Sequence, residues 1–284
     1  MPGYRFCRTD DVPLLVEAYN RCYAVHFEDE PPLTVDEFKR NIRELNLWSS
    51  SCMVASASGE PIGVLLATKR EHEALIYRVG IRPDHQRKGH GHHLLDSLSQ
   101  KLAILGPPRL VAEIPSGWSR VRSFFEDSRY LPETTYADFA MDTPPPPVNT
   151  GDVVSSITLD ELLESGAWDG TLKRSWERSL ETLINRKQQL EGMAIASDQR
   201  LEAFLFHRRN PHDDSREIVA QGSAGDEPAR AVLGILIRHL SGQEPTPVTL
   251  PRISLEEIDF PLLESWGFRK TGEYTAYAAT ATAG

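Results

Sequence analysis

The stretch DHQRKGHGHHLL, residues 84–95, joins an apolar segment to a helical pattern through a turn that carries two glycines and two basic residues. The segment before it, LIYRVGIRP (75–83), is typical of a buried strand, and HHLLDSLSQKLAIL (92–105) has the apolar spacing of a helix. A strand, a glycine-containing turn and a helix N-terminus together favour anion binding, because free backbone N–H groups and the helix dipole attract negative charge. We therefore predict that this turn binds a phosphate-bearing cofactor.

Two other interpretations of the stretch are weaker. Its histidines, which include the adjacent pair His92 and His93, lack the nearby cysteines or second carboxylates of a metal site. Arg87 and Lys88 could simply form a solvated basic turn. The spacing fits neither GxxxxGK[ST] nor a GxGxxG followed by an acidic residue about 20 positions later. We predict a cofactor site of another kind and no metal.

Gln86, Gly89 and Gly91 fit the pattern Q/R-x-x-G-x-G/A, and VGIRPDHQRKGHG (79–91) as a whole resembles the acyl-CoA site of the GNAT superfamily of N-acyltransferases. FFEDSRYLPETTYADFAMD (124–142) is similar to a later motif of the same family. The resemblance implies acetyl-CoA as the co-substrate. It also implies which backbone groups hold that molecule. Amides of the turn would bind the pyrophosphate, and two strand residues would bind the pantetheine arm: Arg87, Lys88, Gly89, His90 and Gly91 in the turn, Val79 and Ile81 in the strand.

Direct acyl transfer needs a deprotonated amine and a proton for the departing thiolate. The family often supplies the acid as a tyrosine, and here that position is Phe125, which cannot donate a proton. The following turn has Arg129-Tyr130 in place of the glycine-aromatic pair. Tyr130 and Tyr136 are the candidate substitutes, although each is also explained as a packing aromatic.

For the base, the candidates are Glu73, on the strand before the turn, and Glu113, on the next strand, each acting directly or through water. Either could instead be an exposed strand carboxylate. The stretch HFEDEPP (26–32) contains Glu28, Asp29 and Glu30 where this family usually shapes its acceptor site. These carboxylates would attract an ammonium group, or they form a solvated acidic loop.

Four consecutive prolines in MDTPPPPVNTGD (141–152) predict a stiff linker, because proline cannot continue a helix or a central strand. We expect a first domain over residues 1–142, a linker over 143–151 and a second domain over 152–284. In the second domain, TLKRSWERSLETLINRKQQL (171–190) predicts the longest amphipathic helix.

The second half repeats the first at an offset of 138 residues. ARAVLGILIRHL (229–240) aligns with GHHLLDSLSQKL (91–102), and LESWGF (263–268) aligns with FEDSRY (125–130). The repeated turn reads GSAGDEPAR (222–230), in which acidic residues replace the anion-binding pattern and Pro228 lacks an N–H group. We predict a second copy that keeps the fold and binds no cofactor.

The composition limits the partners. The net charge of −10 over 284 residues argues against nucleic acid, which requires a basic face. No apolar run reaches the roughly 18–20 residues that span a membrane. The three cysteines form no CxxC pair, so we expect a cytoplasmic protein with reduced thiols.

Together these observations predict an α/β (α+β) protein of two GNAT-like domains, each a mixed, mostly antiparallel sheet flanked by helices. The predicted activity is N-acetyltransfer from acetyl-CoA to a primary amine of a small molecule or peptide. The alternative is a non-catalytic acyl-CoA-binding or protein-interaction module, which Phe125 favours.

Overall fold

The computed structural model describes residues 2–27, 31–142, 154–210, 213–225, 227–243 and 246–283. The chain forms two compact units, of which the first combines Met1–Glu133 with Thr275–Gly284 and the second is Thr134–Tyr274. The predicted linker, 143–151, lies outside the described residues. The predicted second domain, 152–284, contains the last strand, whereas the structure assigns the end of that strand to the first unit.

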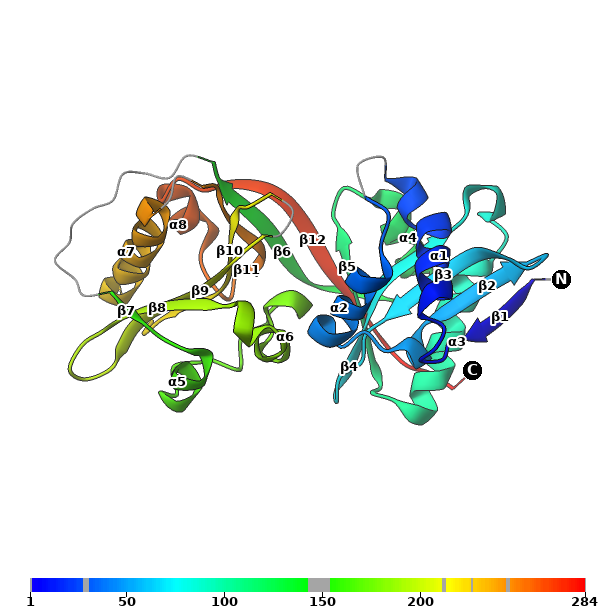
Figure 1. Cartoon of the computed structure of the whole chain (residues 1–284), viewed down its shortest axis with the longest axis horizontal. Helices are drawn as coiled ribbons and strands as arrows, with labels where there is room; N and C mark the ends of the chain where they lie inside the picture. The colour runs from blue at the N-terminus through cyan, green and yellow to red at the C-terminus, as the bar shows by residue number, and fades with distance from the viewer. Residues whose placement is uncertain are drawn as a thin grey trace. The chain divides into compact units, whose positions relative to one another are not determined.

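The first unit is a sheet with helices on both faces (Figure 1). Its strand order is β1-β2-β3-β4-β5-β12, antiparallel from β1 to β4 and parallel between β4 and β5. The strands are β1 (Gly3–Phe6), β2 (Met53–Ala57), β3 (Glu60–Ala67), β4 (Glu73–Ile81), β5 (Arg109–Pro115) and the end of β12 (Arg269–Thr280). The helices are α1 (Val12–Cys22), α2 (Val35–Leu45), α3 (His90–Leu105) and α4 (Ser119–Asp127).

Local sequence explains these elements. The run EPIGVLLA of β3 is buried on both faces, as a central strand requires. Helix α2 begins at a capping box, in which Thr34 accepts a hydrogen bond from the Glu37 N–H and the Glu37 carboxylate accepts one from Thr34. Helices α1 and α2 cover one face of the sheet, and α3 and α4 cover the other.

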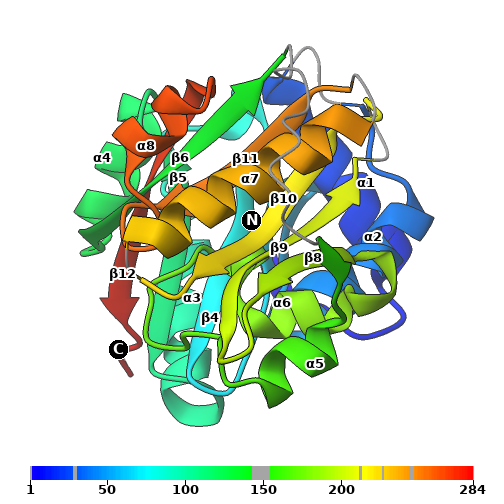
Figure 2. The ribbon, with the colours of Figure 1, turned by 90° about the vertical axis from the view of Figure 1, so that its left-hand side faces the viewer.

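The second unit has the same order of elements. Its sheet runs β7-β8-β9-β10-β11-β6, and α7 lies across it (Figure 2). The strands are β6 (Leu131–Met141), β7 (Ser155–Ser156), β8 (Glu191–Ala196), β9 (Leu201–Arg209), β10 (Arg216–Ser223) and β11 (Val248–Ser254). The helices are α5 (Leu159–Glu164), α6 (Leu180–Asn185), α7 (Glu227–Gln243) and α8 (Phe260–Ser265).

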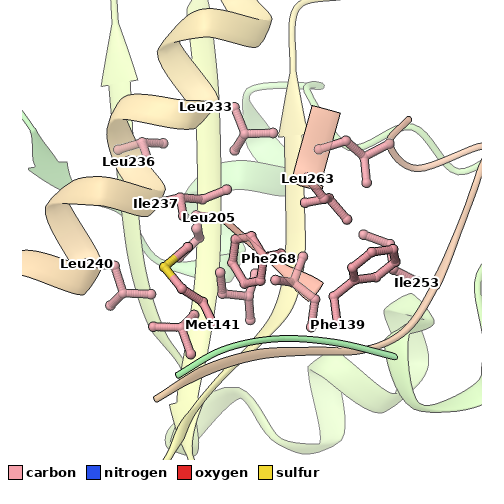
Figure 3. Packing of buried hydrophobic residues seen from close by; sticks show 14 of the residues in the cluster. Phe139, Met141, Leu205, Leu233, Leu236, Ile237, Leu240, Ile253, Leu263 and Phe268 are labelled. Atoms are coloured by element: carbon pink, nitrogen blue, oxygen red, sulfur yellow. The ribbon is translucent and has the colours of Figure 1, made fainter. Parts of the chain in front are cut away.

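The core of the second unit packs leucines of α7 against the sheet and against Phe268, which follows α8 (Figure 3). Phe139 and Met141 of β6 belong to this core. On the other face, the predicted helix over 171–190 is wrong. The segment instead forms a 3-10 turn at Trp176–Arg178, then α6, then a second 3-10 turn at Lys187–Gln189. Ser179 interrupts the helix because its side chain accepts from the Thr182 N–H and caps α6.

The two units exchange their last strands. Strand β6 comes from the first half of the sequence, yet it pairs antiparallel with β11, with Phe139 opposite Leu250. The end of β12 lies beside β5 in the first unit, where the Tyr277 ring is buried in the core. Each unit is therefore completed by a strand from the other half of the sequence.

Among the described residues, no helix has the length and apolar character needed to cross a membrane.

Candidate active site

The site begins where β4 and β5 separate. These parallel strands pair through Glu73–Arg109, Ala74–Leu110 and Leu75–Val111, at their first residues. Strand β4 then continues to Ile81 and β5 to Pro115. The sheet is thus split at the carboxyl ends of two adjacent strands, which leaves main-chain groups of both strands available to a ligand.

The backbone of Val79 and Ile81 faces this split. Arg82 donates its N–H to the Ile62 carbonyl of β3, so residue 82 is a hydrogen-bonded position of the β3–β4 ladder. Because antiparallel ladders alternate, Ile81 and Val79 point their N–H and C=O groups away from β3. Side chains already meet the Ile81 carbonyl, since His26 Nε2 lies 2.9 Å from it and Gln86 donates its amide at 3.2 Å.

The turn after β4 has the backbone shape of an anion site. Arg87 and Gly89 both have left-handed φ angles, 61° and 82°, which turn neighbouring N–H groups toward one side. Gly89 precedes α3 and, among the described residues, no side chain caps that helix. The first N–H groups of α3 therefore lack the acceptor that an N-cap side chain would supply. A Cβ on Gly89 would meet no heavy atom within 4 Å, so the space beside this residue is open.

Charged side chains brace the turn. Lys88 donates its ammonium group to the Asp84 carbonyl at 2.9 Å. Arg82 makes a two-pronged contact with the Asp84 carboxylate, at 2.7 and 2.9 Å, and this hydrogen bonding lowers the pKa of Asp84. Because Asp84 is neutralised by Arg82, Arg87 and Lys88 leave the turn with net positive charge.

The other two predicted turn residues have structural roles. His90 turns its ring into the protein, where Nδ1 lies 2.5 Å from the Tyr4 hydroxyl, and burial lowers the pKa of His90. A Cβ on Gly91 would lie 3.0 Å from the Phe124 ring, so Gly91 lets α3 pack closely against α4. Their backbone N–H groups belong to the first turn of α3, where the helix itself supplies no acceptor.

The two candidate bases lie at opposite ends of the split strands. Glu73 is in the first pair of the β4–β5 register and forms an ion pair with Arg109 at 3.2 Å. It lies eight residues before Ile81, about 26 Å along an extended strand. Glu113 lies two residues beyond Val111, the last paired residue of β5, and is half-buried. Its side chain points away from Ala112 and Ile114, toward the face that α1 and α2 cover. The placement argues against Glu73 and leaves Glu113 as the candidate.

Of the two predicted tyrosine acids, Tyr130 is buried in the core of the first unit and Tyr136 belongs to the second unit. Tyr130 is 3% exposed in the core between the sheet and α3 and α4, with its ring edge-on to Phe125. Burial raises the pKa of Tyr130 well above its usual value, which makes it a poorer acid. Tyr136 belongs to the second unit, where its hydroxyl donates to the Arg174 carbonyl at 3.2 Å. Phe125 itself is 2% exposed and lies in the same core as Tyr130.

Sequence reasoning missed a hydroxyl pair at the carboxyl end of β5. Ser116 Oγ lies 3.3 Å from Thr275 Oγ1, and Thr275 comes from the C-terminal strand. Nearby, Tyr277 donates its hydroxyl to the Glu126 carboxylate at 3.0 Å. No local signal places these residues beside residues 116–126, because the contacts depend on the strand exchange.

Aromatic rings follow the C-terminal end of α1. Tyr23 and Phe27 have ring centroids 5.0 Å apart, and Phe27 stacks on Trp118 at 5.1 Å. Trp118 precedes α4, so this row of rings joins the segment after α1 to the segment after β5. The neighbouring acidic residues, Glu28, Asp29 and Glu30, lie outside the described residues. Within the part of the chain that the structure describes, no group of His, Cys, Asp or Glu has the arrangement of a metal site.

Comparison with known proteins shows which family this part of the chain matches. The model of the acetyltransferase (GNAT) family matches residues 12–117, which include β4, the turn after it and all of β5. The chain is also similar in fold to three solved structures. One is the GCN5-related N-acetyltransferase from Sphaerobacter thermophilus, with a TM-score of 0.72 at 14% identity over 99% of this chain and 96% of that one.

A second is a tandem GNAT protein from the clavulanic acid biosynthesis pathway, with a TM-score of 0.66 at 13% identity over 99% of both chains. The third is a GCN5-related N-acetyltransferase from Anabaena variabilis, with a TM-score of 0.65 at 13% identity over 99% of this chain and 73% of that one. The family model matches the part of the chain that contains the site, and these structures extend the similarity in fold to both units. Residues 12–117 therefore match the GNAT acetyltransferase family, and the chain as a whole is similar in fold to a tandem GNAT protein.

Proposed function

We propose that the first unit binds acetyl-CoA and transfers its acetyl group directly to a primary amine of a small molecule or peptide. The observation that carries the proposal is the split between β4 and β5, which leads into the open, uncapped N-terminus of α3. The GNAT family supports acyl transfer in general. The acetyl group and the amine acceptor are the parts that we add.

The residues of this site fit the acyl-CoA molecule. A pyrophosphate suits the turn, because Gly89 leaves open space and successive N–H groups and basic side chains surround it. A pantetheine arm carries amides, which match the N–H groups of Val79 and Ile81 and the C=O group of Val79, all directed into the split. Acetyl-CoA, when bound, supplies a thioester whose acyl group a neutral amine can accept.

Glu113 is the residue that we assign to proton removal. The amine must lose a proton as its nitrogen forms the C–N bond and the C–S bond breaks. A half-buried carboxylate beside the split can take that proton directly or through one water molecule. The departing thiolate takes its proton from solvent, since Phe125 and the buried Tyr130 offer no donor at the split.

The acceptor and the surroundings form part of the same proposal. The net charge of −10 favours an amine over an anionic partner such as nucleic acid. The cysteines Cys7, Cys22 and Cys52 are buried free thiols, and burial raises their pKa values to about 11, 11 and 12. Reduced, unreactive thiols are compatible with the cytoplasm, which we keep as the proposed location.

The test measures CoA release from acetyl-CoA in the presence of a panel of primary amines. We expect the wild-type protein to release CoA with at least one amine, and Glu113→Gln to lower kcat by a factor on the order of 10²–10⁴. Glu73→Gln is the matched control, because it removes the same charge from the closed end of the strands and should leave kcat within about threefold.

Binding of acetyl-CoA without turnover on any amine would favour the alternative, an acyl-CoA-binding module. Equal losses of kcat in Glu113→Gln and Glu73→Gln would refute the assignment of Glu113 as the base.

A further inference from the structure

The second unit contains a split like that of the first. Strands β10 and β11 pair in parallel through Arg216–Val248 and Glu217–Thr249, at their first residues. Ile218 follows the last paired residue of β10, and Pro251 lies two residues beyond the last paired residue of β11. The carbonyls of these two residues therefore lie at the point where the strands separate. Neither strand can supply a hydrogen-bond donor to the carbonyl of the other there.

Arg178 fills this position. Its guanidinium Nη1 donates to the Ile218 carbonyl at 2.8 Å and to the Pro251 carbonyl at 3.4 Å, so one side chain bridges both strands. Nη2 donates to Gln221 Oε1 at 2.5 Å, and Nε donates to the Glu257 carboxylate at 3.0 and 3.2 Å. The side chains of Arg178 and Glu257 are each 1% exposed.

A buried charge at this place needs an explanation, because an ion pair removed from water often contributes less stability than apolar residues of the same volume. The geometry supplies one. The planar guanidinium has five N–H groups, and all three of its nitrogens donate to acceptors of the split or of the turn after β11. Two of these acceptors are main-chain carbonyls that a separated pair of strands would otherwise bury without partners.

The local chain is built to deliver this side chain. Arg178 ends the 3-10 turn Trp176–Arg178, and its N–H donates to the Ser175 carbonyl. Ser179 then caps α6, so the chain leaves the turn in a new direction. On the opposite side, Ser254 donates its N–H to the Glu257 carboxylate and fixes the carboxylate that faces Arg178.

We infer that Arg178 is an internal occupant of the second split, bridging β10 and β11 where the first unit leaves a ligand position open. The inference goes beyond the proposed function, and only the comparison with the ligand position of the first unit rests on that function. The second unit is therefore closed by its own side chain, independently of the acidic turn over 222–230. It serves as a scaffold whose sheet is complete without a ligand.

The test is amide hydrogen exchange of the full-length protein, followed by mass spectrometry of peptides from β10 and β11. The double variant Arg178→Met with Glu257→Gln removes the bridge together with its carboxylate partner. Arg174, whose Nε lies 3.7 Å from the Glu257 carboxylate, keeps its own hydrogen bond to the Asp169 carbonyl. We expect exchange in β10 and β11 to rise about tenfold or more through local opening, with β4 and β5 unchanged.

The matched control is Arg208→Met with Glu217→Gln. This pair, 2.7 Å apart and 14% exposed on each side, joins β9 to β10 and does not cross the split. We expect it to raise exchange in β10 and β11 by less than about threefold. If the Arg178 double variant raises exchange in β10 and β11 no more than this control does, the inference is wrong. If that variant does not fold, Arg178→Lys decides by the same criterion, since lysine keeps the charge but lacks the planar fork.

Adding acetyl-CoA separates this inference from the proposed function. We expect acetyl-CoA to slow exchange in β4 and β5 of the wild-type protein and to leave β10 and β11 unchanged. Slower exchange in β10 and β11 would show a ligand in the second split and would contradict the role of Arg178. No change in β4 and β5 would contradict the proposed function and leave the variant comparison valid.

Discussion

Arg129 and Gly267, which lie 138 positions apart, have the same left-handed backbone conformation at the same place in their units. Arg129 lies between α4 and β6 with φ at 66°, and Gly267 lies between α8 and β12 with φ at 95°. The turn before the last strand of each half of the sequence thus has a residue with a positive φ. Glycine adopts that conformation without strain, and arginine does not.

Replacing Arg129 with glycine should therefore stabilise the protein. The left-handed conformation costs a residue with a Cβ about 1–2 kcal/mol, and the greater unfolded-state entropy of glycine offsets part of this gain. We expect Arg129→Gly to raise the free energy of unfolding by about 0.5–1 kcal/mol, measured by denaturant titration. The reverse change, Gly267→Arg, should lower it. A destabilising Arg129→Gly would mean that the arginine side chain contributes more than its backbone costs.

Because the last strands are exchanged, a substitution in β6 or β12 should destabilise the unit that consists mainly of the other half of the sequence. Tyr277 of β12 is 3% exposed in the first unit, and Phe139 of β6 is 1% exposed in the second. Truncating a buried aromatic ring to alanine costs about 3–5 kcal/mol. We expect Tyr277→Ala to loosen the first unit and Phe139→Ala to loosen the second, as seen in the peptides released by limited proteolysis.

Tyr277→Phe is the control for the first of these variants. It keeps the ring and loses the hydrogen bond to Glu126, so it should cost only about 1 kcal/mol. If Tyr277→Ala loosened α7 and left α3 intact, the assignment of β12 to the first unit would be wrong.

His90 predicts how the stability of the first unit depends on pH. The pKa of His90 is lowered, first by burial and then by the positive charges of His85, Lys88 and His93. The unfolded chain therefore binds more protons than the folded one below the ordinary value of 6.5. The stabilising effect of a neutral His90 is complete above pH 6.5 and is lost as the pH falls below it.

We expect the melting temperature to fall between pH 7 and pH 5, and His90→Gln to make that fall smaller. Tyr4→Phe is the companion variant, because it removes the contact between the Tyr4 hydroxyl and His90 Nδ1, which lie 2.5 Å apart. If the melting temperature depended on pH identically in the wild type and in His90→Gln, His90 would not cause the pH dependence.

The local sequence pattern was sufficient to predict the strand, turn and helix around residues 75–105, because hydrophobic periodicity and glycine spacing depend on residues close together in the sequence. It also revealed the repeat of Arg129 and Gly267. It could not tell Glu73 from Glu113, since both are strand carboxylates. Only the register of β4 and β5 shows which end of the strands separates.

Two other features depend on contacts far apart in the sequence. The last strands of the two halves are similar in length and carry aromatic residues at matching positions, Tyr136 with Tyr274 and Phe139 with Tyr277, so the exchange leaves no local signal. Arg178 lies in a segment with helical spacing, and the tertiary network with Ile218 and Glu257 overrides that spacing. Gly91 fits a ligand-binding pattern, yet the Phe124 ring supplies a separate reason for its lack of a side chain.

The central claim is that the turn between β4 and α3 holds acetyl-CoA, and calorimetric titration tests it most directly. Gly89→Glu places a side chain and a negative charge in open space at a φ of 82°, beside the N–H groups that would bind the pyrophosphate. We predict one acetyl-CoA site per wild-type chain and a loss of affinity on the order of 100-fold or more in Gly89→Glu, from like-charge repulsion and lost N–H contacts. Unchanged affinity in a folded Gly89→Glu protein, or two sites in the wild type, would contradict the account.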